Sequence, residues 1–150
     1  MAAHSTLTGA DLHEPKGVAA ATAGQVYQTN GAGSGSHVNN YYTLLVTISN
    51  VSSAQTVYVP FGFAGTVKKI TSVLKNAITV ADATITAKNS GGSSMGTLTI
   101  AFSGSAAGDI DTLSPSSNNT FSADDFITVE TDGGSTTAAE LVLMIEVLRS

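Results

Sequence analysis

The chain has 150 residues, with 6 basic and 11 acidic side chains that give a formal charge of −5, and it has no cysteine. Disulfides and thiolate metal sites are therefore excluded, and six scattered basic residues give no footprint for a nucleic-acid backbone. The longest apolar run, residues 141–145, is far shorter than the roughly 20 residues of a membrane span. We expect neither a nucleic-acid partner nor a membrane.

Charged residues make up only 11% of the chain, so Ser, Thr, Asn and Gly must supply much of the surface polarity. Hydroxyls and amides cost less to bury in a contact than Lys or Glu side chains. This composition is common in β-proteins that pack side by side in assemblies.

Residues 1–40 are small and polar, with little periodicity, and predict an extended N-terminal arm. The segment 31–36, GAGSGS, is a flexible linker by composition. Residues 18–23, closed by Gly24, are compatible with one short helical turn. The first 17 residues have no basic region followed by an apolar one, so we expect no secretory signal. We expect the protein to be made in a cytoplasm.

The arm carries spaced apolar residues that could anchor it to a partner surface, and a proline that favours an extended path. We predict that these partner-binding residues are Leu7, Leu12, Pro15, Val18, Val26 and Tyr27. The alternative is a disordered spacer.

Short runs of alternating, β-branched residues follow from residue 41 onward, separated by Gly, Asn, Ser and Asp. This pattern predicts strands. The expected strands are residues 41–48, 56–59, 66–74, 83–88, 97–102, 125–130 and 141–148. Turns spaced by roughly 8–12 residues favour an antiparallel β-sandwich over residues 41–150.

The last predicted strand, residues 141–148, is apolar on both faces apart from Glu146. Such a strand is usually central and covered on both sides. Its second cover could be a neighbouring subunit or loops of its own domain.

No constellation of side chains indicates catalysis, a metal site or a cofactor. The three histidines, His4, His13 and His37, all lie in the arm. His13-Glu14 lacks the second histidine of a zinc-protease motif, because position 17 is Gly17. Gly33-Ser34-Gly35 has no helix after it, so it is no nucleophile elbow. No Lys-Ser/Thr pair follows these glycines and no buried strand precedes them, so they form no phosphate loop. We expect a non-enzymatic protein.

Two acidic pairs remain, Asp109 with Asp111 and Asp124 with Asp125. Carboxylates in loops at one end of a sandwich could gather around calcium. They could equally be solvated residues that cap turns.

Residues 7–17, LTGADLHEPKG, resemble a segment found near the N-termini of tailed-bacteriophage virion proteins. Residues 56–148 resemble the small jelly-roll cement proteins of phage heads, through YVPF at 58–61, GTV at 65–67, AAGD at 106–109 and FSADDFITV at 121–129. In this resemblance Asp124 stands where a glycine is expected.

The resemblance implies a jelly-roll-like sandwich and a capsid decoration (cement) protein on the outer capsid surface of a virion. Its partners would be the major capsid protein and itself, as a homotrimer or a dimer. A head-fibre or tail-fibre anchoring protein is one alternative, and a carbohydrate-binding jelly-roll module is another.

Overall fold

The computed structural model describes residues 21–32 and 35–150. All elements of these residues are β-strands, which confirms the predicted all-β class. Within these two ranges no helix is long and apolar enough to span a bilayer. The chain divides into two units, with the boundary between Asn40 and Tyr41.

The described part of the smaller unit is a β-hairpin. Strand β1 (Gln25–Thr29) pairs antiparallel with β2 (Gly35–Asn39). The prediction of a featureless linker over residues 31–36 was therefore wrong at its end, because Gly35 and Ser36 begin β2. The predicted helical turn over residues 18–23 lies mostly outside the described residues.

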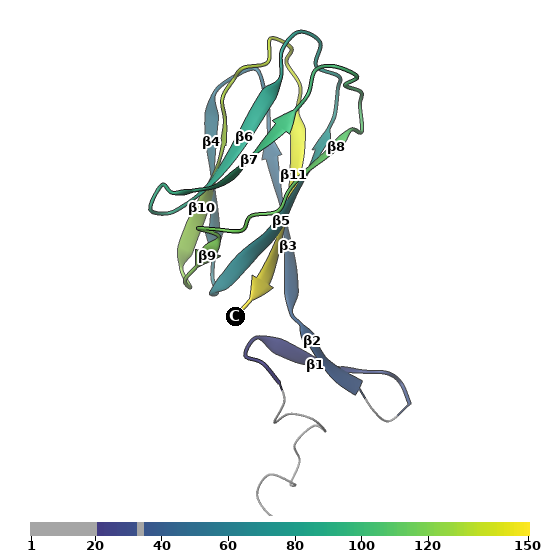
Figure 1. Ribbon diagram of the computed structural model, residues 1–150, viewed down its shortest axis with the longest axis vertical. Helices are drawn as coiled ribbons and strands as arrows, with labels where there is room; N and C mark the ends of the chain where they lie inside the picture. The colour runs from purple at the N-terminus through teal and green to yellow at the C-terminus, as the bar shows by residue number, and fades with distance from the viewer. Residues whose placement is uncertain (1–20, 33–34) are drawn as a thin grey trace, which may run out of the picture. The chain divides into compact units, whose positions relative to one another are not determined.

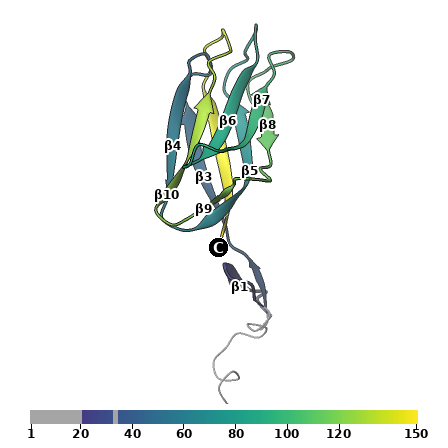
Figure 2. The same ribbon diagram turned by 60° about the vertical axis from the view of Figure 1, so that its left-hand side comes forward.

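The larger unit is a sandwich of two antiparallel sheets, the two layers visible in Figure 1 and Figure 2. The β10 sheet has the order β4 (Gln55–Phe61), β10 (Asp125–Thr131), β6 (Ala83–Asn89) and β7 (Ser94–Ile100). The β11 sheet has the order β3 (Tyr41–Ile48), β11 (Leu141–Arg149), β5 (Gly65–Leu74) and β8 (Ile110–Leu113), and β9 (Thr120–Phe121) pairs with the start of β5.

Consecutive strands mostly alternate between the sheets. The chain crosses over after β3, β4 and β5, makes one hairpin within a sheet from β6 to β7, and crosses again to β8. This order is consistent with the predicted jelly roll. All seven predicted strands are present, whereas β8 and β9 were not predicted because they are too short to show alternation.

The core lies between the two sheets. Strand β11 points Leu141, Leu143, Ile145 and Val147 inward, and all four are fully buried. Burying one large aliphatic side chain stabilises a fold by roughly 1.5–3 kcal/mol. Near the β9 end, the rings of Phe61 and Phe121 stack with centroids 3.9 Å apart.

Strand β11 is central, as predicted, because it pairs with β3 on one side and β5 on the other. Its second face is less covered than expected. Val142, Met144 and Leu148 are each only partly buried. In the described part of the larger unit, its own loops do not provide the second cover that the sequence predicted.

The turn before β10 shows why a glycine is expected at the position that Asp124 occupies. Asp124 has a φ of 61°, in the left-handed region that favours glycine. The position therefore requires the conformation that the resemblance indicated, and this chain adopts it with aspartate, one of the residues that tolerates it best.

The carboxylate of Asp132 ties the end of β10 to β6. Asp132 Oδ1 accepts hydrogen bonds from the N–H groups of Thr84 (3.1 Å) and Gly134 (3.0 Å), and Oδ2 accepts one from Thr84 Oγ1 (2.6 Å). Partial burial on its own would raise the pKa of Asp132, but together these hydrogen bonds lower it below its usual value.

Replacing Asp132 with asparagine should lower the free energy of unfolding at pH 7 by about 1 kcal/mol or less, because the carboxylate is mostly exposed and its hydrogen bonds are screened by water. The lowered pKa means that the carboxylate stabilises the fold above pH 3.8, and that this contribution is lost as the pH falls. Urea unfolding at several pH values should show the two proteins converging in acid. A constant gap would contradict this account.

Asp111 provides a control, because its carboxylate is expected to affect stability in the opposite direction to that of Asp132. Burial, followed by repulsion from Asp109, raises the pKa of Asp111. The ionised form of Asp111 is therefore disfavoured in the folded state, so the free energy of unfolding falls as the pH rises above 3.8. We expect Asp111→Asn to raise the melting temperature at pH 7 and to have little effect in acid.

Candidate interaction surfaces

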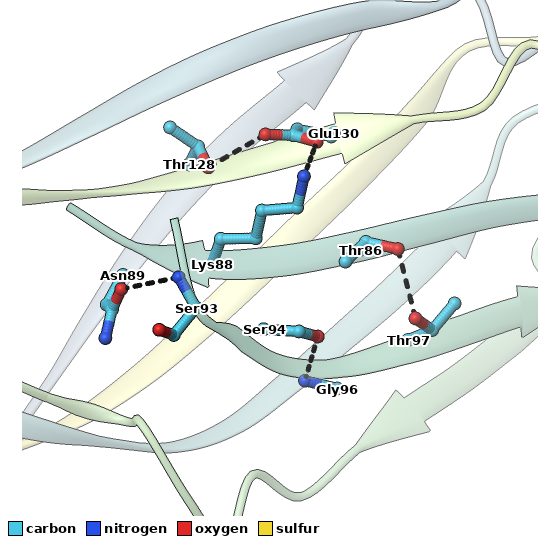
Figure 3. A network of polar contacts seen from close by, with 9 residues as sticks. All are labelled: Thr86, Lys88, Asn89, Ser93, Ser94, Gly96, Thr97, Thr128 and Glu130. Atoms are coloured by element: carbon cyan, nitrogen blue, oxygen red, sulfur yellow. Dashed lines mark hydrogen bonds and ion pairs between the residues drawn. The ribbon is translucent and has the colours of Figure 1, made fainter. Parts of the chain in front are cut away.

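The outer face of the β10 sheet is polar across β10, β6 and β7, where its groups satisfy one another, whereas Tyr58 on the edge strand β4 is 65% exposed and packs edge-on against Phe126. The hydroxyls of Thr86 and Thr97 hydrogen-bond at 3.0 Å across β6 and β7 (Figure 3). Lys88 Nζ pairs with Glu130 Oε2 at 2.5 Å, and Thr128 Oγ1 donates to Glu130 Oε1 at 3.3 Å. A face of this kind is suited to contact with water.

The outer face of the β11 sheet has the opposite character. The strand register brings apolar side chains from β3, β11, β5 and β8 together across its middle. We call this set the apolar band, and it consists of Leu45, Val73, Ile110, Val142 and Met144. Leu45 is 73% exposed and Ile110 is 63% exposed.

Two rows form the band. One row runs Thr47–Val142–Val73–Ile110, and the next runs Leu45–Met144–Thr71–Thr112. Thr71 Oγ1 is buried without a hydrogen-bond partner among the described residues. The hydroxyl of Thr71 therefore adds no polarity to the exposed surface of its row.

A pair of opposite charges bounds the band at each end. At one end Lys75 Nζ and Glu140 Oε1 form an ion pair at 2.5 Å. At the other end Glu146 lies opposite Lys69 in the strand register. A β-bulge at this point leaves Lys68 as an extra residue on β5, next to Lys69. Both acids lie on or next to β11, and both paired bases lie on or next to β5.

Two of the predicted arm anchors fall in the described hairpin. Val26 pairs with Val38, and Tyr27 pairs with His37, with ring centroids 5.3 Å apart. As neighbours on one strand, Val26 and Tyr27 point to opposite faces of the hairpin. A two-stranded hairpin is only marginally stable in water on its own. No contact of the described residues tests whether Val26 and Tyr27 bind a partner, so this role stays a prediction.

The other predicted anchors, Leu7, Leu12, Pro15 and Val18, lie outside the described residues. No feature of residues 21–32 and 35–150 tests their role.

The two acidic pairs do not meet. Asp109 and Asp111 lie near the Leu74 end of β5, whereas Asp124 and Asp125 lie near its Gly65 end. Ten residues of strand separate them by about 30 Å. In the described ranges no three acidic or histidine side chains are grouped to hold a metal ion.

Members of both acidic pairs instead accept hydrogen bonds in turns. Asp109 Oδ2 accepts from the N–H of Ala106 at 2.6 Å, and Asp125 Oδ1 accepts from the N–H of Phe126 at 2.8 Å. Hydrogen bonds from the Ser90 side chain and the Phe126 backbone lower the pKa of Asp125. For these two residues the structure supports the turn-capping alternative.

A depression between the β6–β7 turn and the β9–β10 turn bears on the carbohydrate alternative. Its lining is polar apart from Phe121, and consists of Asn89, Ser90, Gly91, Thr120, Phe121, Ser122 and Asp125. Phe121 is only 6% exposed and stacks within the core, so this depression offers no aromatic platform for a sugar ring.

Comparison with known proteins identifies a likeness of fold. No protein-family model and no curated protein matches the chain. The structure is similar to a chain in the acidic stable capsid structure of Helicobacter pylori bacteriophage KHP30, with a TM-score of 0.50 and 11% sequence identity. The match covers 74% of this chain and 90% of that chain. At this identity the comparison establishes a shared fold.

Proposed function

We propose that this protein is a structural component of a bacteriophage virion, which binds the outer surface of the capsid and stabilises the shell. The observation that carries the proposal is the fold likeness to a chain of a phage capsid structure, across 90% of that chain. One feature of this chain supports it: the low content of charged residues, which is common in β-proteins that pack side by side.

The mechanism is thermodynamic. A protein that binds the assembled shell and not its separate subunits stabilises the shell by mass action, by about 2.7 kcal/mol per site at a free concentration 100 times the Kd. Modest contacts repeated over the shell add up, so no single strong site is needed. The major capsid protein supplies the surface in this account.

The arm serves as the attachment device. Its predicted anchors Leu7, Leu12 and Tyr27 would bury apolar surface against the shell, and the hairpin strands β1 and β2 have edges that can accept a further strand. The polar face of the β10 sheet would remain in contact with water.

The arm hypothesis is tested by adding purified protein to particles that lack it. We expect the wild type to co-sediment with the particles and to raise their rupture temperature. The double variant Leu7→Ser/Leu12→Ser should bind at least tenfold more weakly, because each leucine loses roughly 1.5–3 kcal/mol of burial. His4→Ala, in the same arm, is the matched control and should bind as the wild type does.

Two results would count against these ideas separately. Equal binding and protection by the double leucine variant would show that these anchors do not attach the protein. Failure of the wild-type protein to bind particles at all would contradict the decoration function itself.

A further inference from the structure

We propose that the outer face of the β11 sheet is a two-fold interface with a second copy of this chain. The inference rests on the apolar band and on the charges around it, and it does not depend on where the protein sits in a virion. The resemblance to cement proteins implied self-association as a trimer, with a dimer as the alternative, and the charge pattern of this face favours the dimer.

The first argument is the contrast between the two outer faces. On the β10 sheet, Thr86, Lys88 and Glu130 engage partners within the chain, and the exposed Tyr58 lies on the edge strand β4 rather than across the middle of the sheet. On the β11 sheet, Leu45 and Ile110 are mostly exposed. Each lies beside another apolar side chain in the strand register, Leu45 beside Met144 and Ile110 beside Val73. Contiguous exposed apolar side chains on one face of a soluble domain mark an interaction site.

The second argument is the order of the charges, which identifies the partner. Glu140 and Glu146 lie on the β11 side, and Lys75 and Lys69 lie opposite them on the β5 side. A two-fold axis along the strands, between β11 and β5, places each glutamate over a lysine of the partner subunit. The face is therefore complementary in charge to a copy of itself.

The same charges exclude the other in-plane axis. A two-fold axis across the strands would place Glu140 over Glu146 of the partner subunit, and Lys75 over Lys69 of the partner subunit. Like charges brought together at an interface are unfavourable. The charge pattern therefore specifies the orientation of the dimer as well as its partner.

The apolar band fits this orientation. The axis along the strands places Val142 over Val73 of the partner subunit, and Met144 over Thr71 of the partner subunit. Both contacts exclude water from carbon surface, because Thr71 exposes no hydroxyl. Aligned packing of two sheets in this manner is a common arrangement in β-proteins.

The size of the face sets the expected affinity. Strand spacing of about 4.8 Å and a rise of about 3.3 Å per residue give the four strands between the two charged rows on the order of 400 Å² of flat area per copy. This area, about 800 Å² for the two copies together, lies below the range of stable specific interfaces and in the range of weak, transient ones. We therefore expect a dimer with a Kd in the micromolar range.

Sedimentation of the full-length chain over a range of concentrations tests the proposal. We expect a reversible monomer–dimer equilibrium. Leu45→Lys should raise the Kd at least tenfold, because it places a charge in the apolar band. Thr99→Lys puts the same side chain on an exposed position of the opposite face, and should leave the Kd unchanged.

A charge swap tests the identity and orientation of the partner. Glu146→Lys alone and Lys69→Glu alone should each weaken the dimer at least tenfold, because each opposes like charges. The double variant should return the Kd to within about threefold of the wild type, since opposite charges again face each other. Thermal unfolding at low concentration checks that each variant is folded.

Several results would overturn the proposal. These are a wild-type chain that stays monomeric at high concentration, a trimer mass, a dimer insensitive to Leu45→Lys, or a double swap that fails to restore association. Loss of particle binding by Leu45→Lys in a chain that is monomeric would assign the face to a capsid subunit instead. Because sedimentation is measured without particles, its failure leaves the decoration function standing.

Discussion

Replacing Ile145 with alanine is expected to lower the free energy of unfolding by about 3–4 kcal/mol. Ile145 is fully buried at the middle of β11, where it lies between Leu44 on β3 and Ile70 on β5. Truncation removes its burial energy and leaves a cavity that a central strand cannot close. Urea unfolding at low protein concentration measures the change.

The adjacent residue supplies a matched control. Met144 lies on the outer face of the same strand and is only partly buried. We expect Met144→Ala to cost less than about 1 kcal/mol in the monomer. Equal costs at the two positions would contradict the register of β11, since a slip of one residue exchanges the inward and outward faces of a strand.

Replacing Gly133 with alanine should lower the free energy of unfolding by about 3 kcal/mol, from two separate causes. Gly133 has a φ of +71°, which strains any residue with a Cβ. A Cβ there would also lie 2.5 Å from the backbone nitrogen of Ala54, and the backbone of one loop would have to move.

Gly92 separates these two causes. Its φ of +81° is similar, but a Cβ at Gly92 would meet nothing within 4 Å. We expect Gly92→Ala to cost about 1 kcal/mol, from backbone strain alone. Equal losses of stability in the two variants would show that the loop carrying Ala54 does not approach Gly133 as closely as the structure has it.

Much of the sandwich could be predicted because inward residues alternate along its longer strands. The expected strand 41–48 has the observed bounds of β3. The start of β7 was missed because the register shifts within it: Gly96 pairs with Ala87 and Ser94 with Lys88, which leaves Met95 as an extra residue. A bulge of this kind interrupts the alternation that identifies a strand.

The β1–β2 hairpin was missed for a different reason. Its loop and the start of β2 share one Gly- and Ser-rich segment, and composition alone does not separate a linker from a hairpin loop. The paired residues, Val26 with Val38 and Tyr27 with His37, were the available signal.

The apolar band was only partly visible in the sequence. The apolar outer positions of residues 141–148 indicated a second face that requires a cover, from a neighbouring subunit or from loops of its own domain. The contributions of Leu45, Val73 and Ile110 come from three other strands, and only the register brings them together. Likewise, the position of Glu146 opposite Lys69 depends on the pairing of β11 with β5, which no local sequence pattern specifies.

The central claim, that this chain decorates a capsid, is tested most directly by a cryo-electron microscopy map of the virion that contains it. We expect density for the two-sheet sandwich at many equivalent positions on the outer surface of the shell. Density confined to one vertex or to the tail would identify a fibre-anchoring protein instead. Absence of the chain from purified virions would contradict the account as a whole.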